Sequence, residues 1–331
     1  MATPMIPGMI PHPQAPAFLD RAGWGGANIL PLAGDASFRR YFRVAGDGPK
    51  GVRRAVLMDA PPDLEDSRPF LAVARHLDAI GFRAPRILAE DLGLGLFLLE
   101  DFGDARMRET IEADPAAETP IYQRATDLLI DLHATPPAAI PPYDMAVYQR
   151  EAGLFPEWYM PAVGATGDTD AYRAAWDEAL APIAHDRSAT VLRDYHAENI
   201  MLPDDGMLGL LDFQDALAGH PLYDLVSLLQ DARRDVPEAV EAAMIARYAA
   251  RRPFDDAAYA LLGAQRNAKI LGIFTRLWKR DGKPRYLAFQ PRMWSYLERD
   301  LAHPALAPVK AWFDAHVPTA LRAAFWSEPR A

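Results

Sequence analysis

The sequence predicts an α+β fold in which a small antiparallel-sheet lobe precedes a larger, mostly helical lobe. Up to about residue 102, short apolar and β-branched runs are separated by Gly and Pro, which is typical of strands and turns. From about residue 104, apolar residues recur at helical spacing. The chain of 331 residues is also too long for one simple core. We therefore expect a flexible, proline-rich arm over residues 1–16, an N-lobe over residues 17–102 and a C-lobe over residues 103–331.

The N-lobe is expected to follow the order strand, strand, strand, helix, strand, strand. "ANILPLAGDASFRRYFRV" predicts two strands joined by a turn at residues 34–37, and "RRAVLMDA" predicts a third strand that ends at two prolines. The helix is expected in "DLEDSRPFLAVARHLDAIGF", where acids lie in the first turn and Gly81 follows the last apolar residues. "APRILAEDLGLGLFLLEDFGD" then predicts two strands around a Gly-containing turn, with a hinge near residues 100–103.

The C-lobe is expected to be mainly helical apart from one stretch. "ETPIYQRATDLLIDLHA", "PLYDLVSLLQDARRDV" and "FDDAAYALLGAQRNAKILGIFTRLWKR" have helical periodicity, and several helical segments begin at Pro or Asp. Between the first two lies "VLRDYHAENIMLPDDGMLGLLDFQDA", residues 191–216. It predicts short buried strands with polar residues at their ends and in the loop between them.

The composition limits the classes of function. The chain has 35 basic and 45 acidic residues, and the resulting net charge of −10 argues against nucleic-acid binding. The first residues have no basic segment followed by an apolar run, so no signal peptide is predicted, and no apolar run is long enough to cross a bilayer. Cysteine is absent, which excludes disulfides and thiolate metal sites. We expect a cytoplasmic protein that binds no membrane and needs no obligate protein partner.

Asp194, Asn199 and Asp212 are the candidate catalytic residues. Asp194 precedes Asn199 by five positions in "RDYHAEN", and Asp212 begins "DFQ" after an apolar run. Phosphoryl transfer from ATP to a hydroxyl needs a carboxylate that accepts the hydroxyl proton and oxygen ligands that hold Mg²⁺. In protein kinases an Asp and an Asn are also five positions apart, and a second metal-binding Asp begins a D-F-G string. A β-hairpin with polar turns is the simpler alternative, but the apolar runs beside each residue favour a phosphotransferase site.

The string Asp-x-His-x-x-Asn, filled by Asp194, His196 and Asn199, with Asp212 downstream, resembles the aminoglycoside phosphotransferase-like kinases. This resemblance implies a protein-kinase-like bilobal fold, ATP as co-substrate and Mg²⁺ as the metal. Longer strings, among them "GDASFRRYFRV", "LLEDFGD" and "KILGIFTRL", are similar to the anomeric kinases of N-acetylmuramate and N-acetylglucosamine. That similarity implies phosphorylation of these amino sugars at the C1 hydroxyl, to sugar 1-phosphates, in peptidoglycan recycling.

The same resemblance implies a role for each candidate residue. Asp194 would accept the hydroxyl proton, and Asn199 and Asp212 would bind the metal. The nucleotide would be bound by residues of the N-lobe turns and strands, namely Gly34, Asp35, Ala36, Ser37, Arg43, Val56, Glu100 and Phe102. The sugar would be bound by polar residues around and beyond Asp194, namely His196, Gln214, Asp215, Asp224 and Arg234.

Two of these sugar-binding candidates have an equally simple structural interpretation. His196 is better suited to brace its loop than to titrate during the reaction. Asp224 could cap a helix or brace a loop instead of binding the sugar. Arg234 is included because a guanidinium suits the lactyl carboxylate of N-acetylmuramate.

The third strand departs from the kinase pattern. Kinases place a Lys there to bind the phosphates, whereas "AVLM" ends in Met58, and no Lys lies between residues 51 and 268. Arg39 and Arg43 on one face of the second strand, or Arg40 on the other, could supply the missing charge, although a solvated strand edge would explain them equally well. Met58 also leaves a nucleotide-binding pseudokinase open. An aminoglycoside or another small alcohol is the alternative acceptor.

Overall fold

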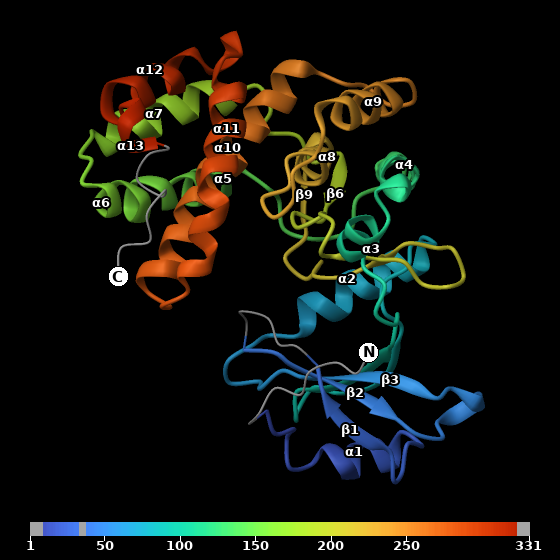
Figure 1. Cartoon of the computed structure of the whole chain (residues 1–331). Helices are drawn as coiled ribbons and strands as arrows, with labels where there is room; N and C mark the ends of the chain where they lie inside the picture. The colour runs from blue at the N-terminus through green and yellow to red at the C-terminus, as the bar shows by residue number, and fades with distance from the viewer. Residues whose placement is uncertain (1–8, 33–37, 323–331) are drawn as a thin grey trace. The chain divides into compact units, whose positions relative to one another are not determined.

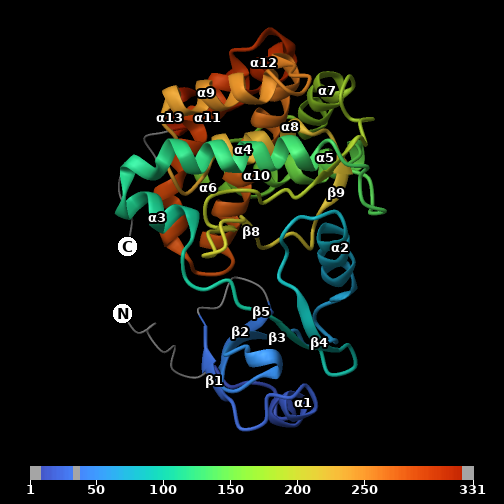
Figure 2. The ribbon, with the colours of Figure 1, turned by 90° about the vertical axis from the view of Figure 1, so that its right-hand side faces the viewer.

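The computed structural model describes residues 9–32 and 38–322 of the chain (Figures 1 and 2). The chain forms two compact units, and each unit is built from two separate stretches of sequence. Unit 1 consists of Met1–Thr110 and Glu198–Asp215, and unit 2 consists of Ile111–Ala197 and Ala216–Ala331. The stretch that contains Asn199 and Asp212 therefore belongs with the N-terminal sheet, whereas the sequence assigned it to the C-lobe.

Unit 1 contains the predicted sheet. Its strands are antiparallel in the order β1-β2-β3-β5-β4, with β1 at Asn28–Pro31, β2 at Arg40–Ala45, β3 at Arg54–Asp59, β4 at Ile87–Asp91 and β5 at Leu96–Glu100. Helix α2, Arg68–Ala79, lies between β3 and β4 in the chain. The predicted order of strands and helix is confirmed. The turn predicted at residues 34–37 lies outside the described residues.

One face of this sheet packs against helix α1, Ala15–Arg21, which has Pro16 in its first turn. Phe42 and Val44 of β2 and Leu57 of β3 are fully buried in this core, because alternate residues of a strand point to the same face. Helices α1 and α2 lie on opposite sides of the sheet (Figures 1 and 2).

Part of the segment expected to be a flexible arm contacts the sheet of unit 1. The backbone N–H of His12 donates to the Asp59 carboxylate at 3.0 Å. The Arg40 guanidinium donates to the Ile10 carbonyl at 3.1 Å, and helix α1 begins at Ala15. Residues 10–15 are therefore attached to β2 and β3.

The other face of the sheet carries the position that holds a Lys in kinases. Met58 is paired directly with Tyr41 of β2 and Phe97 of β5, and its side chain is fully buried. Strand β2 lies between β1 and β3, so it is an interior strand and not an edge. The position that holds a Lys in kinases is therefore occupied here by a buried apolar side chain.

Residues 198–215 complete unit 1. Strands β7, Ile200–Met201, and β8, Gly209–Leu210, form an antiparallel pair. The N–H groups of Leu202 and Leu210 donate at 2.8 Å each to the carbonyls of Ala105 and Arg83, which join this pair to the first stretch of the unit. Gly209 allows the Phe102 ring to approach closely, since a Cβ at this position would lie 2.6 Å from the ring.

Unit 2 is mainly helical, as predicted (Figure 1). Helix α3, Met107–Ala113, starts in unit 1 and ends in unit 2. The later helices are α4 Glu118–Leu132, α5 Met145–Ala152, α6 Met160–Val163, α7 Thr169–Leu180, α8 Leu222–Leu229, α9 Glu238–Ala249, α10 Asp256–Lys279, α11 Gln290–Leu301, α12 Ala307–His316 and α13 Thr319–Arg322. Strands β6, Ala189–Val191, and β9, Leu217–Gly219, form a second antiparallel pair.

Helix α8 is shorter than its sequence periodicity indicates. The apolar pattern continues to Val236, but the helix ends at Leu229. Beyond it, the Asp231 carboxylate accepts hydrogen bonds from the backbone N–H groups of Ala197 and Arg233. An Asp that bonds to nearby backbone groups in this way competes with the helix, so the chain turns there.

Helix α10 is the centre of unit 2. Its residues 258–272 are buried on all sides, and they include the charged side chains of Arg266 and Lys269. At Gly272 an added Cβ would lie 2.4 Å from the backbone of Leu154, so the close contact with the preceding segment requires glycine. Within residues 9–32 and 38–322, no helix has the length and apolar character that a membrane span requires.

Candidate active site

Asp194 lies in unit 2, in the loop that follows β6. Arg193, immediately before it, has a φ of 70°. This left-handed conformation costs a non-glycine residue about 1–3 kcal/mol and persists only where the surroundings hold it. Both carboxylate oxygens of Asp224 do so, because they accept the backbone N–H of Leu192 at 2.6 Å and that of Arg193 at 2.8 Å.

Helix α8 and the turn after it hold the rest of the loop. The Ser227 hydroxyl donates to the Arg193 carbonyl at 3.0 Å. The Asp231 carboxylate accepts the N–H of Ala197 at 3.2 Å. Because Asp224 also comes from α8, one helix and its following turn fix the backbone on both sides of Asp194.

The carboxyl group of Asp194 is kept ionised by its surroundings. Burial by itself raises the pKa of this group, but the nearby charges of Lys269, Arg193 and Arg266 outweigh that effect and lower it. At neutral pH Asp194 is therefore a carboxylate, the form that can orient a hydroxyl group and accept its proton.

His196 is a bracing residue by its geometry. It is 3% exposed, and its Nε2 lies 2.9 Å from the Arg233 guanidinium, which can only donate. Burial lowers the pKa of His196, and the charges of Arg233 and Arg266 lower it further. The imidazole is therefore neutral, and this favours the bracing role over a role in sugar binding.

The two predicted metal ligands lie together in unit 1. Asn199 precedes β7 and Asp212 follows β8, and the Asn199 Nδ2 is 3.5 Å from the Asp212 Oδ2. Asp212 itself has a left-handed backbone, with a φ of 59°. Asp194 directly follows the left-handed Arg193, so a left-handed residue lies at or beside both acids. The Gln214 amide donates to the Asp212 Oδ1 at 2.6 Å.

These residues fit a magnesium ion. An amide and a carboxylate supply hard oxygen ligands, and Mg²⁺ in phosphotransferases takes one or two carboxylates from the protein and further oxygens from phosphates. In the described part of the chain there is no cluster of three or more His, Cys, Asp or Glu side chains arranged to hold a metal. A metal at Asn199 and Asp212 would thus complete its coordination with nucleotide oxygens and water.

A second group of side chains in unit 1 lies next to Asp212. Phe213 stacks on Phe70 of α2, with ring centroids 5.3 Å apart and an angle of 14° between the rings. The Arg39 guanidinium lies 5.9 Å from the Phe70 ring centre and pairs with Glu65 at 2.6 Å. Arg39 is only 5% exposed. Asp212, a predicted metal ligand, is therefore linked through two stacked rings to a buried cation.

Arg43, the cation predicted to bind the nucleotide, has a different environment. Its guanidinium pairs with Asp101 at 2.8 Å and with Asp104 at 2.8 Å. Burial opposes the charge, but the hydrogen bonds that Arg43 donates to these carboxylates raise the pKa of Arg43. Two negative charges already neutralise this group, so the geometry favours a structural role, in which Arg43 attaches β2 to residues 101–104.

The other predicted nucleotide residues are placed as follows. Gly34, Asp35, Ala36 and Ser37 lie outside the described residues. Val56 is half-buried on the same face of β3 as Met58. The Glu100 N–H donates to the Arg86 carbonyl at 2.9 Å, and the Glu100 carboxylate pairs with Arg83 at 2.7 Å. Phe102 is buried against Gly209.

The predicted sugar residues are divided between the two units. Asp215 is exposed and Gln214 bonds to Asp212, both in unit 1. In unit 2, Arg234 pairs with Glu118 and packs on the Tyr122 ring at 5.6 Å. Asp224 is fully buried and bonds to the backbone of the Asp194 loop, which favours the loop-bracing alternative for this residue.

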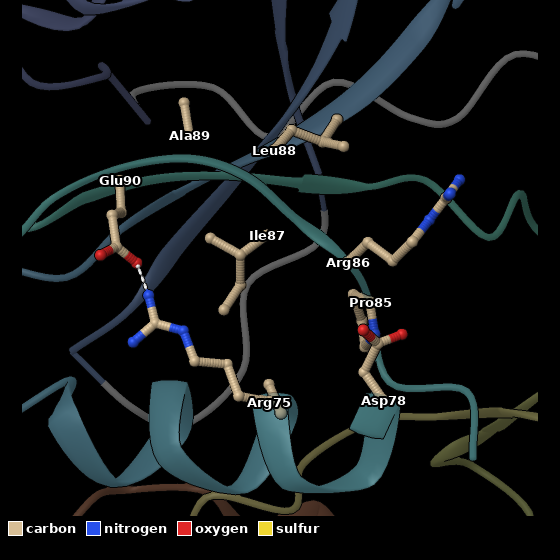
Figure 3. Close-up of a pocket in the computed structure, with 9 residues that line it drawn as sticks. Arg75, Asp78, Pro85, Arg86, Ile87, Leu88, Ala89 and Glu90 are labelled. Atoms are coloured by element: carbon tan, nitrogen blue, oxygen red, sulfur yellow. Dashed lines mark hydrogen bonds and ion pairs between the residues drawn. The ribbon is translucent and has the colours of Figure 1, made fainter. Parts of the chain in front are cut away.

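One pocket of unit 1 lies between α2 and β4 (Figure 3). The Arg75 side chain reaches from the helix to Glu90 on the strand and forms an ion pair of 2.6 Å. The lining residues include none of the candidate site residues. This pocket is therefore not the predicted site.

Sequence reasoning missed several residues that hold the site. From the sequence, Glu65, Phe70 and Ser227 are expected only as parts of helical segments, and Asp231 as a candidate for the sugar. The pairing of Arg39 with Glu65 joins residues 26 positions apart, and no periodicity of the sequence indicates it. A buried Ser in the apolar run "LVSLL" was the one signal that could have pointed to Ser227.

Comparison with known proteins identifies the class. Residues 28–262 match the phosphotransferase enzyme family, which is more than half of the chain. The chain belongs to this family, and it is an ATP-dependent kinase with an alcohol group as acceptor.

Two relatives are more specific. The chain is 40% identical to an N-acetylmuramate/N-acetylglucosamine kinase of Caulobacter vibrioides, over 92% of this chain and 96% of that protein. It is also 40% identical to the protein of the same name from Pseudomonas aeruginosa, over 86% of this chain and 88% of that protein.

Solved structures confirm the fold class. A choline/ethanolamine kinase family protein from Mesorhizobium loti has a TM-score of 0.62 at 16% identity and covers 90% of this chain and 97% of its own. An aminoglycoside-3'-phosphotransferase of type VIII has a TM-score of 0.53 at 16% identity, over 78% of this chain and 100% of its own. The predicted protein-kinase-like fold, with an antiparallel sheet followed by a mostly helical part, is confirmed.

Proposed function

We propose that the chain is a cytoplasmic sugar kinase that transfers the γ-phosphoryl group of ATP to the anomeric C1 hydroxyl of N-acetylmuramate and N-acetylglucosamine. The sugar 1-phosphates would enter peptidoglycan recycling. Relatives named for these two sugars align over most of the chain, which supports the choice of substrate. The observation that carries the proposal is the loop around Asp194, an ionised carboxylate whose neighbouring backbone groups are fixed by α8.

Asp194 acts on the acceptor. Its carboxylate orients the C1 hydroxyl and accepts the proton, while the hydroxyl oxygen forms a bond to the γ-phosphorus. The bond from that phosphorus to the β,γ-bridging oxygen breaks, and ADP leaves. Because the pKa of Asp194 is lowered, the carboxylate is a weak base. Proton transfer therefore follows the start of oxygen–phosphorus bond formation, which makes the hydroxyl more acidic.

Asn199 and Asp212 hold Mg²⁺ in this proposal, and the metal neutralises charge on the phosphates. Gln214 fixes the Asp212 carboxylate by donating to its Oδ1, which supports a role beside the metal more directly than a role in sugar binding. Asp215 and Arg234 stay predictions for the sugar. Val56, Phe102, the Glu100 backbone and residues 34–37 stay predictions for the nucleotide.

Arg39 is the cation that we assign to the ATP phosphates. Arg39 directly precedes β2, two residues before Tyr41, which is paired with the fully buried Met58. Glu65 and Tyr41 hold the Arg39 side chain, and one carboxylate pairs with it, whereas Arg43 is shared by two carboxylates. A guanidinium suits phosphate oxygens because its planar fork of N–H groups matches their geometry.

The proposal is tested by product analysis. The protein is incubated with Mg²⁺-ATP and either N-acetylmuramate, N-acetylglucosamine or kanamycin, and the products are read by phosphorus-coupled proton NMR. A phosphate-coupled anomeric proton with either acetylated sugar is expected, and Asp194→Asn should bind ATP but give no product. Phosphorylated kanamycin alone would overturn the substrate. No product from any acceptor would favour a nucleotide-binding pseudokinase.

A further inference from the structure

A group of buried charges in unit 2 lies behind the Asp194 loop. Its centre is Glu151 of α5, which is 5% exposed. The Glu151 carboxylate pairs with the Arg193 guanidinium and with the Lys269 Nζ at 3.1 Å, and the Tyr143 hydroxyl donates to it. Lys269 also lies 3.3 Å from the Tyr223 hydroxyl. We refer to Arg193, Glu151 and Lys269 as the charge triad.

Lys269 differs from every other lysine of the chain. All five lysines fall within the described residues, and Lys269 alone is buried, at 9% exposure. Removing two cations and an anion from water is unfavourable, and apolar residues of similar volume often replace such groups without loss of stability. A gain in folding stability therefore does not explain why these three charged residues are buried together, so a functional role has to explain their burial.

The net charge of the triad is positive and the nearest reacting group is negative. Two cations and one carboxylate leave one positive charge, and Asp194 directly follows Arg193 in the chain. Among the charges near Asp194, that of Lys269 has the largest effect in lowering the pKa of Asp194. The triad therefore balances the charge of the catalytic carboxylate.

The triad also completes the support of the left-handed residue. Asp224 and Ser227 bind the backbone N–H and carbonyl of Arg193, and Glu151 binds its side chain. Backbone and side chain of Arg193 are thus fixed at the same time. Since φ at Arg193 determines the direction in which the chain enters Asp194, this anchoring sets the direction of the Asp194 side chain.

We propose that Glu151 and Lys269 are positioning residues for Asp194: Glu151 fixes the left-handed turn through the Arg193 side chain, and Lys269 supplies the charge that Asp194 requires. The proposal rests on the assignment of Asp194 as the proton acceptor. In this proposal neither Glu151 nor Lys269 contacts the acceptor or the nucleotide, so both residues act through the Asp194 loop.

The charge effect gives opposite signs in two variants. Lys269→Met removes a cation, so the acid limb of the pH profile of kcat/KM, which reports Asp194, should move to higher pH. Glu151→Gln removes an anion, so the same limb should move to lower pH. In both variants kcat should fall at least tenfold while KM for ATP stays within about twofold. Lys269→Arg should keep the acid limb where it is in the unchanged protein.

The other charged or titratable groups near Asp194 are unchanged in these variants. They are Arg266 on α10, His196 and Arg193 on its own loop, and Asp224 on α8. Since none of them is substituted, a difference in the direction of the two shifts is assigned to residues 151 and 269.

Glu241 provides a matched control. It is buried to a similar degree, at 6% exposure, and it likewise accepts from an arginine, Arg299, and from a tyrosine, Tyr259. Glu241→Gln removes an equivalent buried charge on α9, outside the Asp194 loop. The acid limb in this variant should stay within 0.2 pH units of that of the unchanged protein (roughly 0.3 kcal/mol).

A measurement without substrate separates this proposal from the proposed function. Hydrogen exchange of the peptide covering residues 189–197, followed by mass spectrometry, should be at least tenfold faster in Glu151→Gln and unchanged in Glu241→Gln. Equal exchange in the two variants, or shifts of the acid limb in one direction for Lys269→Met and Glu151→Gln, would overturn the positioning role. If the unchanged protein phosphorylates no sugar, the proposed function fails, and the exchange result still decides whether Glu151 holds the loop.

Discussion

Asn199 and Asp212 are 13 residues apart in the sequence, and the Asn199 amide nitrogen lies 3.5 Å from the Asp212 carboxylate. The two residues flank the short strands β7 and β8, whose pairing brings them together. An amide and a carboxylate at this distance can share one cation through their oxygen atoms.

Asp212→Asn should lower phosphoryl transfer about 100-fold or more, since a neutral amide is a weaker ligand for Mg²⁺ than a carboxylate. The Mg²⁺ concentration at half-maximal rate should rise in the same variant. The measurement is the initial rate as a function of Mg²⁺ at fixed ATP. Asp205→Asn, on the β7–β8 turn, is the control; an equal loss there would mean that the hairpin and not the ligand was damaged.

Arg39→Ala should raise KM for ATP roughly tenfold, because the variant loses a buried cation that we assign to the phosphates. Arg43→Ala should leave KM for ATP within about twofold and lower the stability instead, because Asp101 and Asp104 lose their shared partner. ATP titrations and urea unfolding of both variants decide between the residues. The reverse result would return the phosphate role to Arg43, as the sequence predicted.

Asp224→Asn should destabilise the chain by about 2–3 kcal/mol, since one acceptor oxygen is replaced by an N–H₂ group that faces a backbone N–H. The Asp194 loop should loosen, so kcat should fall with little change in KM for the sugar. Urea unfolding and sugar titrations measure the two effects. A rise in KM for the sugar at unchanged stability would support the sugar-binding role instead.

The stability of the chain should depend on pH through Asp300. Burial raises the pKa of this carboxyl group to about 8, and Gln230 and Asn267 donate to it at 3.1 Å each. Its ordinary pKa is 3.8, so between about pH 4 and pH 8 the folded state holds a proton that the unfolded state has lost. Stability therefore falls as pH rises through this window.

In Asp300→Asn the side chain cannot titrate, so the folded and unfolded states no longer differ by this proton. The difference in the free energy of unfolding between the variant and the unchanged protein should shift in favour of the variant by about 2 kcal/mol from pH 6 to pH 8. Urea unfolding at both values measures it. A difference that is independent of pH would show that Asp300 is already ionised in the folded state at pH 6.

Much of the fold could be predicted from the sequence. The strands of unit 1 follow alternating apolar patterns, and their ends coincide with Gly and Pro, so local chemistry is enough to place them. The end of α8 could not be predicted in this way, because Asp231 interrupts the helix through a bond to Ala197, 34 positions earlier.

The residues of the candidate site also fall into those that the sequence alone could suggest and those that depend on distant partners. Asp194, Asn199 and Asp212 could be proposed from the sequence because phosphoryl transfer needs these side-chain types and the kinase pattern has this spacing, and their roles stay predictions. The roles of Arg43 and Asp224 could not, since each depends on partners remote in sequence: Asp101 lies 58 positions from Arg43, and Leu192 lies 32 positions from Asp224. Such pairings exist only once the units have formed.

The division of unit 1 into two stretches has a consequence for how the protein is made. When the ribosome has synthesised residue 110, all five strands of the sheet have been made, but the β7–β8 pair of the same unit follows only after residue 197. Until then Phe70 lacks the ring of Phe213, and the Arg83 carbonyl lacks the Leu210 N–H. A nascent chain at this stage carries an unfinished apolar surface that chaperones can recognise, and an isolated fragment of residues 1–110 should not reach the native state.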